Sequence, residues 1–190
     1  MSRFEIRIAG MGGQGIITAG VMIGRAASIF GGKNVTLAQS YGPESRGGTC
    51  KAEVIVSDDQ VDYPKLREPS LIAVMSQEAY LKNLPDFKPD TIVILDPDMV
   101  EEDESARSKA KIFRVPATRM AERLGKRIVT NMVMVGAIVG LTECANLEAV
   151  EKAIRKYTPR GTEQLNLDAF KSGYDYVRQE REQMVITQKV

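Results

Sequence analysis

The stretch from Gly10 to Gly15 is the part of this chain best suited to hold a ligand. It reads Gly10-Met11-Gly12-Gly13-Gln14-Gly15 and joins a β-type run to a helical pattern. Glycines let a backbone turn sharply and approach a ligand closely, and free N–H groups at a helix start favour an anion. The spacing of Gly10, Gly12 and Gly15 fits the dinucleotide fingerprint. The stretch therefore predicts a nucleotide-like or phosphate-bearing ligand, with Gln14 either aimed at that ligand or capping the loop.

A second polar, glycine-rich stretch, Ser40–Gly48, follows another strand-like run. Its candidate ligand contacts are Ser40, Tyr41, Glu44 and Arg46. Arg46 offers a planar fork of donors to phosphate or carboxylate, or pairs with Glu44, while Tyr41 either packs or stacks on a ring. Loops that leave the carboxyl ends of neighbouring parallel strands converge on one sheet edge. If the first two strands are adjacent, their ends lie about 5 Å apart and the two loops face one crevice.

The sequence lacks the second element of an ordinary dinucleotide site, the acidic residue that holds the ribose. An NAD or FAD site needs an acidic residue at the end of the next strand, about 20 residues beyond the glycines. The run Asn34–Gln39 continues instead into Ser40 and Tyr41, and the nearest carboxylate, Glu44, follows a Gly-Pro step. Arg46 is a weak candidate for an NADP phosphate. Tight packing of a strand on a helix, with no ligand, is an alternative reason for the glycines.

Composition excludes several kinds of chemistry. Lysine and arginine number 26 against 25 acidic residues, so no global field marks a nucleic-acid binder. Histidine is absent, which removes the commonest general base and metal ligand at neutral pH. Two cysteines, Cys50 and Cys144, are too few for an iron–sulfur cluster. We therefore expect no catalytic residue and no metal site on this chain.

Strand-like and helix-like runs alternate through the first two thirds of the chain. This rhythm predicts a Rossmann-like, three-layer α/β/α fold with a mostly parallel sheet. Because the run 50–57 follows the second loop without a helix, we expect antiparallel pairing or an edge excursion there. The expected strands are 4–9, 34–39, 50–57, 71–75, 91–95 and 111–115, and the expected helices are 15–30, 77–84 and 117–124.

The remainder of the chain predicts a helical carboxyl-terminal part. Ile128–Leu141 is apolar nearly all round, and Gly136 and Gly140 lie one helical turn apart, which allows close approach of another element. Helical spacing recurs at Leu147, Val150, Ile154 and Tyr157 and again at Phe170, Tyr174 and Val177. Without repeats or a linker, we expect residues 1–190 to form one domain. Absence of a signal peptide or a bilayer-length apolar run favours a cytoplasmic location.

Charge is unevenly placed between residues 96 and 127. Acidic side chains dominate 96–104, whereas 105–127 contains eight basic residues and one acidic one, Glu122. Solvated loops and helix faces are the simpler interpretation. A docking surface for an acidic protein or a ligand phosphate is the alternative.

The two glycine-rich motifs together resemble a known family. Gly10–Gly15 followed by Ser40-Tyr41-Gly42-Pro43-Glu44-Ser45-Arg46-Gly47-Gly48 is similar to the gamma subunit of 2-oxoacid:ferredoxin oxidoreductases, in the variant found in 2-oxoglutarate and branched-chain enzymes. The helix that begins Thr130-Asn131-Met132 and the segments Asp62-Tyr63-Pro64 and Met75–Ala79 also look like that family. The resemblance covers about residues 4 to 157.

The resemblance implies a subunit of an enzyme that oxidatively decarboxylates a 2-oxoacid, forms acyl-CoA and reduces ferredoxin. Thiamine diphosphate, magnesium and iron–sulfur clusters are then expected on partner alpha, beta and delta subunits of a heterotetramer, the delta subunit being ferredoxin-like. This chain would serve assembly and contact coenzyme A through Gly10–Gly15 and Arg46. Isolated, it could form a homodimer. The alternatives are a stand-alone NAD(P)-dependent oxidoreductase, a purely structural partner, and a gamma-type subunit of an indolepyruvate or branched-chain enzyme.

Overall fold

The computed structural model describes residues 3–42 and 48–187, and its centre is a six-stranded sheet in the order β2-β3-β1-β4-β5-β6. Strands β1, β4, β5 and β6 are parallel, while β3 runs antiparallel to both of its neighbours, β1 and β2. The mostly parallel sheet expected from the alternating pattern is confirmed. The strands are β1 (Arg3–Met11), β2 (Asn34–Tyr41), β3 (Thr49–Ser57), β4 (Leu71–Val74), β5 (Ile92–Leu95) and β6 (Lys111–Arg114).

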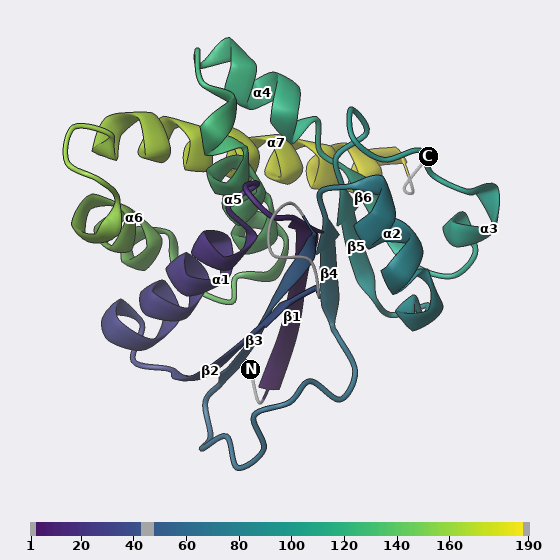
Figure 1. Ribbon diagram of the computed structural model, residues 1–190, viewed down its shortest axis with the longest axis horizontal. Coiled ribbons are helices and arrows are strands. Elements are labelled where there is room, and N and C mark those ends of the chain that lie inside the picture. Colours follow the sequence, from purple (N-terminus) through teal and green to yellow (C-terminus); the bar gives the residue numbers. More distant parts are fainter. Residues whose placement is uncertain (1–2, 43–47, 188–190) are drawn as a thin grey trace.

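Helices cover the two sheet faces unequally (Figure 1). One face carries α1, α5, α6 and α7 with α4 beside them, and the other carries α2 and the single turn α3. The helices are α1 (Ile16–Arg25), which continues into the π-helical turn η1 (Ala26–Phe30), α2 (Gln77–Asn83), α3 (Glu104–Arg107), α4 (Ala117–Arg123), α5 (Thr130–Thr142), α6 (Leu147–Tyr157) and α7 (Glu163–Thr187), with 3-10 turns η2 (Leu84–Asp86) and η3 (Arg127–Val129).

The first two strands are not adjacent, contrary to the condition set in the sequence analysis. Strand β3 leaves β2 through a short connection and turns back between β2 and β1, pairing with both. The antiparallel pairing expected for residues 50–57 is therefore confirmed, and the strand lies at an internal position of the sheet, not at its edge. Because β2 and β1 both run against β3, their carboxyl ends still lie at one sheet edge, separated by about 10 Å, or two strand spacings.

Apolar residues of β4 explain why the centre of the sheet is buried on both sides. Leu71 and Ala73 belong to the larger core beneath α1 and α5, whereas Ile72 and Val74 belong to a smaller core beneath α2 and α3. Side chains alternate across a strand, so a continuous apolar run fits a strand covered on both faces.

Helix α5 is the most deeply buried helix, and α7 packs directly on its backbone. All residues from Thr130 to Leu141 are buried. A methyl group added at Gly136 would overlap the carbonyl oxygen of Phe170, and one added at Gly173 would overlap that of Val133. Glycine at both crossing positions therefore allows the two backbones to approach closely, as the Gly136 and Gly140 spacing predicted.

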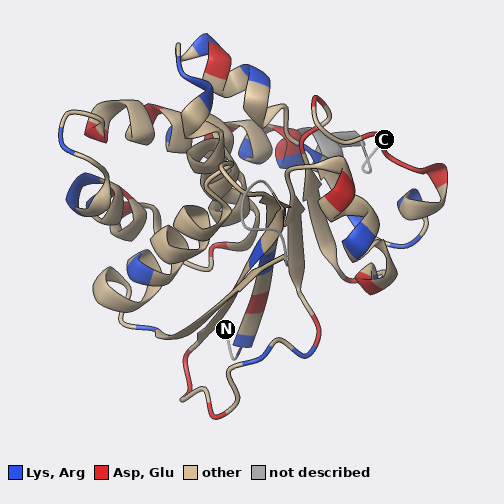
Figure 2. Ribbon diagram, viewed as in Figure 1, with Lys and Arg blue, Asp and Glu red and all other residues tan. Residues whose placement is uncertain are grey.

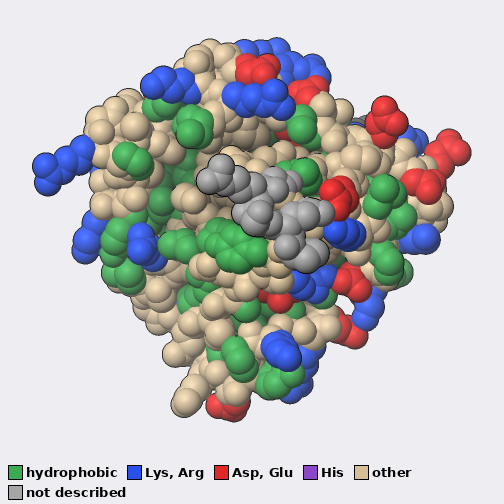
Figure 3. Space-filling view, in the orientation of Figure 1, with side chains coloured by type: hydrophobic (Ala, Val, Ile, Leu, Met, Phe, Trp, Pro, Cys, Tyr) green, Lys and Arg blue, Asp and Glu red, His purple; other side chains and the backbone are tan. Residues whose placement is uncertain are grey.

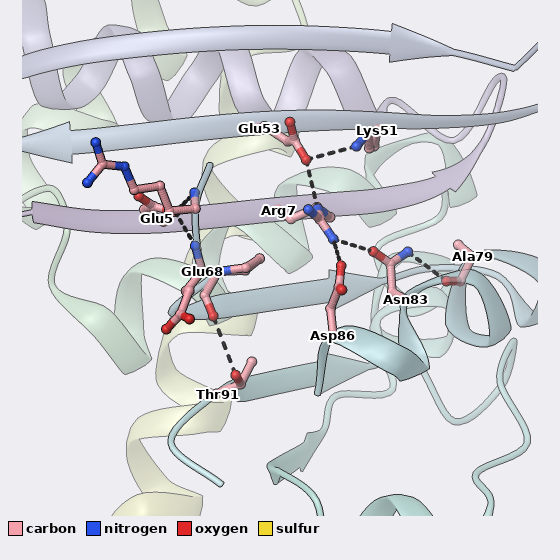
Figure 4. Close-up of polar contacts among 11 residues, drawn as sticks. Glu5, Arg7, Lys51, Glu53, Glu68, Ala79, Asn83, Asp86 and Thr91 are labelled. Atoms are coloured by element: carbon pink, nitrogen blue, oxygen red, sulfur yellow. Dashed lines mark hydrogen bonds and ion pairs between the residues drawn. The ribbon is translucent and has the colours of Figure 1, made fainter. Parts of the chain in front are cut away.

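An ion-pair network fastens α2 to the part of the sheet that the larger helical layer leaves open (Figure 4). Arg7 on β1 donates to Glu53 on β3 at 2.8 Å, to Asn83 at 3.1 Å, and to Asp86 just after α2. The side chains of Arg7 and Glu53 are each only 13% exposed. Because its guanidinium donates to Glu53, Asn83 and Asp86, Arg7 holds α2 over β1. The neighbouring strands β3 and β2 have no covering helix on this face.

Two kinds of feature are missing from the described part of the chain. Among residues 3–42 and 48–187, no helix has the length and apolarity needed to cross a membrane. In the same ranges, no group of three or more histidine, cysteine, aspartate or glutamate residues is placed to hold a metal ion.

Candidate functional site

The glycine loop between β1 and α1 is held in shape by Gln14. Its side-chain oxygen accepts the Met11 N–H at 2.7 Å, and its side-chain nitrogen donates to the Met75 carbonyl at 2.7 Å. Met75 follows β4, the strand next to β1, so Gln14 ties together the carboxyl ends of two parallel strands. Of the two roles considered for Gln14, capping the loop is the one that the structure shows.

Positive φ angles explain two of the glycines. Gly13 has φ 94° and Gly15 has φ 72°, a region in which residues with a side chain are strained. A methyl group at Gly15 would also overlap the amide of Asn131, which donates to the Gly15 carbonyl at 3.3 Å. At Gly13 an added methyl would meet open space. Gly15 is thus needed for packing, whereas Gly13 faces a cavity.

A cavity of about 250 Å³ opens at the sheet edge between the carboxyl ends of β1 and β4, where the following helices go to opposite faces of the sheet. The helix after β1 lies on one face and the helix after β4 lies on the other, and such a division is the usual ligand position in open α/β sheets. The residues around this cavity, here named the switch-point cavity, are Gly13, Gln14, Met75, Thr118, Arg127, Ile128 and Thr130.

Arg127 gives the switch-point cavity a positive charge. Its guanidinium contacts the Met99 sulfur at 3.2 Å, and no carboxylate of the described residues pairs with it. The hydroxyls of Thr118 and Thr130 already donate, to Asp96 and to the Arg127 carbonyl. The N–H of Gly13 has no acceptor within the described segments. One free backbone donor and an unpaired cation thus border this space, so it suits an anion.

A second cavity, of about 440 Å³, begins on the other side of Gly13. It runs between α1, the start of α5 and the α6–α7 connection, and is here named the α1–α5 groove. Ile128, 78% exposed, stands between it and the switch-point cavity. Its lining comprises Gly13, Gly15, Thr18, Met22, Lys126, Ile128, Val129, Asn131, Met132, Tyr157, Thr158, Pro159, Thr162, Leu165 and Asn166.

The second glycine-rich stretch meets the first through its backbone. The Gly12 N–H donates to the Gly48 carbonyl at 2.9 Å, so the two stretches touch at the sheet edge. Ser40 and Tyr41 line a different cavity, of about 340 Å³, against α2 on the less covered face, together with Arg7 and Lys82. Glu44 and Arg46 lie outside the described residues. A single crevice shared by Gly10–Gly15, Ser40, Tyr41, Glu44 and Arg46 stays a prediction.

Four of the eight basic residues between 105 and 127 have carboxylate partners. Arg107 and Arg114 pair with Glu102, Arg119 pairs with Asp98, and Lys111 lies 3.9 Å from Asp90. For those four, the interpretation as solvated ion pairs fits. Figure 2 shows basic residues on α4 and on the turn after it. Within the described ranges, no carboxylate pairs with Lys109, Arg123, Lys126 or Arg127.

Sequence reasoning missed Arg127, Met75, Thr118 and Thr130 as neighbours of the glycine loop. Met75 and Thr118 follow strands β4 and β6, so the rule that ligands sit at the carboxyl ends of parallel strands could have found them. Arg127 precedes a helix that crosses back toward the loop, and no local signal identified it beyond the excess of basic residues.

Fold and site together define an α/β module with a glycine loop at its switch point. Residues 5–176 match the family described as Pyruvate ferredoxin/flavodoxin oxidoreductase. The chain belongs to this family, so the resemblance drawn from the two motifs is confirmed.

Two comparisons place the chain among subunits of 2-oxoacid oxidoreductases, and a third shares its fold. It is 48% identical over 181 residues to "2-oxoglutarate synthase subunit KorC" of Methanothermobacter thermautotrophicus, covering 92% of this chain and 95% of that one. The keto/oxoacid ferredoxin oxidoreductase gamma subunit of Geobacter sulfurreducens has 37% identity and a TM-score of 0.83, covering 93% and 97% of the two chains. The 2-oxoglutarate:ferredoxin oxidoreductase of Magnetococcus marinus shares the fold, with 23% identity, a TM-score of 0.86, and coverage of 94% of this chain and 32% of that one.

Proposed function

We propose that this chain is the gamma subunit of a 2-oxoglutarate:ferredoxin oxidoreductase and that its glycine loop contacts coenzyme A in the assembled enzyme. Such an enzyme decarboxylates a 2-oxoacid, transfers the acyl group to coenzyme A and passes the electrons to ferredoxin. The observation that carries the proposal is the switch-point cavity, where Gly13 and Arg127 present an N–H and a guanidinium without an anionic partner. A diphosphate fits this pair of groups.

Assembly with other chains is the second part of the proposal. This chain matches only 32% of the length of the Magnetococcus protein with the same fold. In that protein the module is therefore continuous with further polypeptide. We infer that alpha, beta and delta subunits supply what this chain lacks, with thiamine diphosphate, magnesium and iron–sulfur clusters on them, in a cytoplasmic heterotetramer. Separated from these partners, the chain would form a homodimer, measurable by light scattering after gel filtration.

Two substitutions in the co-purified enzyme test the coenzyme A contact. Arg127→Gln removes a charge-assisted hydrogen bond, and Gly13→Ala places a methyl group in the space beside the loop. Each should raise the KM for coenzyme A about tenfold and leave the KM for the 2-oxoacid within about twofold. Arg46→Ala belongs in the same series. The measurement is steady-state acyl-CoA formation with each substrate varied in turn. A larger effect on the 2-oxoacid than on coenzyme A would contradict the proposal.

The geometry weakens the NAD(P) alternative. In a dinucleotide fold the second strand lies beside the first and ends in the ribose contact. Here β3 occupies the position beside β1 and runs antiparallel, and β2 ends in Gln39, Ser40 and Tyr41 without a carboxylate. Tight NADH binding by the purified chain would revive this alternative. Comparing 2-oxoglutarate with branched-chain 2-oxoacids and indolepyruvate as substrates separates the remaining alternatives, as does identification of the chains that co-purify.

A further inference from the structure

We propose that strand β2 is an association edge, at which the chain pairs antiparallel with β2 of a second copy. The two six-stranded sheets then become one continuous sheet. This inference rests on one part of the proposed function, the homodimer, and names the surface that forms it. It does not depend on the coenzyme A contact at Gly13 and Arg127.

The two edges of the sheet differ in how well they are protected. Strand β6 forms one edge, has four residues and carries Lys111 and Arg114 at its ends. Short, charged edge strands discourage pairing with another chain. Strand β2 forms the other edge and has eight residues, none of them charged and none of them proline. A long, uncharged edge is a ready template for a further strand, so β2 is the edge at which association is expected.

The backbone of β2 has a partner on one side only. Asn34–Tyr41 pairs with β3, and no strand lies beyond it in the described sheet. Within the described residues, no backbone or side-chain group outside β3 bonds to the main chain of Val35–Tyr41. The outward N–H and C=O groups of an edge strand match those of an identical antiparallel strand.

Burial shows that the larger core ends at β2 with apolar side chains half covered. No residue of β2 is buried. Val35 and Leu37 pack against the larger core and remain partly exposed, and Tyr41 is 68% exposed. Ile29, on the preceding turn η1 that contacts β2, is 54% exposed. Figure 3 shows further apolar side chains at the surface over α1 and α6, which lie to the left of β2 in Figure 1.

The residue pattern of β2 explains why an identical strand fits. Residues opposed across an antiparallel pair lie on the same face of the sheet, so a twofold axis at Ala38 pairs Thr36 with Ser40 and Val35 with Tyr41. Hydroxyl pairs and pairs of an aromatic with a β-branched residue both stabilise neighbouring strands. Two like charges are nowhere opposed, because β2 has none. A twofold contact of this kind closes at two copies.

The size and charge of this contact predict its strength. An eight-residue strand with η1 beside it is smaller than the about 20–30 residues a side of a standard interface. We therefore expect a dissociation constant in the micromolar range. Because the strand is uncharged, raising the salt concentration should change that constant little.

A lysine at the centre of β2 tests the pairing. Ala38 is partly exposed and lies beside Glu53 of β3, so Ala38→Lys is compatible with the folded chain. In the dimer two such lysines would be directly opposed, and the dissociation constant should rise about tenfold or more. Gln179→Lys, which adds the same charge on the exposed side of α7 away from β2, is the matched control. Sedimentation velocity over a range of concentrations measures association, and thermal denaturation checks folding.

A cross-link tests the geometry directly. Directly opposed residues of an antiparallel pair have α-carbons about 4.5–5.5 Å apart, a separation that a disulfide bridges. Ala38→Cys should therefore give a covalent dimer on mild oxidation, detected on a non-reducing gel. Ser108→Cys, at an exposed position after α3, should give none. The native cysteines, Cys50 and Cys144, are buried and do not compete.

Three outcomes overturn the inference, and they can be told apart from failure of the proposed function. If the chain dimerises but Ala38→Lys associates as tightly as the unaltered chain, or Ala38→Cys forms no cross-link, the homodimer uses another surface. If the chain stays monomeric at every concentration, the homodimer fails together with this inference. Neither result alters the effect of Arg127→Gln and Gly13→Ala on the KM for coenzyme A, which tests the proposed function separately.

Discussion

At the scale of single residues, some residues of the glycine loop hold it in shape, whereas Gly13 makes no such contact. Gln14 uses both ends of its amide to bind Met11 and Met75, and Gly15 gives its carbonyl to Asn131. Gly13 alone among these combines a positive φ angle with open space around its α-carbon. The residues that hold the loop in shape thus differ from the one that we propose contacts a ligand.

Alanine substitutions at Gly15 and Gly13 should differ in their effect on stability. Gly15→Ala combines left-handed backbone strain with displacement of Asn131, and should lower the free energy of unfolding by about 3 kcal/mol. Gly13→Ala carries the strain alone and should cost about 1–2 kcal/mol. Urea denaturation of the purified chain measures both. Equal losses would mean that Asn131 moves aside without consequence.

The glycine loop was predictable from sequence at this scale, whereas its partners were not. Consecutive glycines between a strand and a helix are a local signal, so Gly10–Gly15 stood out. Arg127 reaches the loop only because η3 and α5 cross back over the sheet edge, a tertiary arrangement without a local pattern. Glu44 and Arg46, the expected anion contacts, fall outside the described residues, and their role stays a prediction.

At the scale of elements, the strands were found within a residue or two of their ends, but the order of the sheet was not. Hydrophobic alternation reports whether a segment is a strand, since side chains point to opposite faces in turn. It does not report which strand lies beside it. The short connection after β2 indicated that β3 pairs antiparallel with β2. That β3 also pairs with β1, and so lies between the two strands, is a long-range contact that the local pattern does not contain. Helix α3, a single turn, was not anticipated.

The α5–α7 crossing offers a sharp test at this scale. Gly173→Ala would drive a methyl group into the Val133 carbonyl, which belongs to a helix backbone and cannot shift alone. We expect a loss of about 3 kcal/mol or more in the free energy of unfolding, as for overpacking of a buried contact. Ser172→Ala, one position earlier on α7, is the control and should cost less than about 1 kcal/mol. Thermal denaturation followed by circular dichroism compares the two.

At the scale of the whole molecule, the larger core joins segments from both halves of the chain. Cys50 on β3 and Cys144 after α5 both belong to it, and both are free thiols. Burial raises the pKa of the Cys50 thiol, and burial raises that of Cys144 to about 11, although a hydrogen bond from Thr142 acts in the opposite direction. Both thiols therefore report on opening of the same core.

Thiol labelling at pH 8 should show neither cysteine reacting in the folded chain. The thiolate is the reactive form, and a pKa above its ordinary value keeps each group protonated at that pH. Titration with an aromatic disulfide reagent should detect two thiols in denaturant and far slower reaction without it. Rapid labelling of one thiol in the native chain would show that its part of the core opens independently.

The position of α5 has a consequence for synthesis of the protein. Its residues from Met132 to Leu141 are apolar on every side, and α7, the last helix described, covers one of those sides. During translation, α5 leaves the ribosome well before residues 163–177 are available to it. The apolar surface of α5 would then stay exposed for seconds. During that interval a nascent chain of this kind most needs a chaperone or a partner protein.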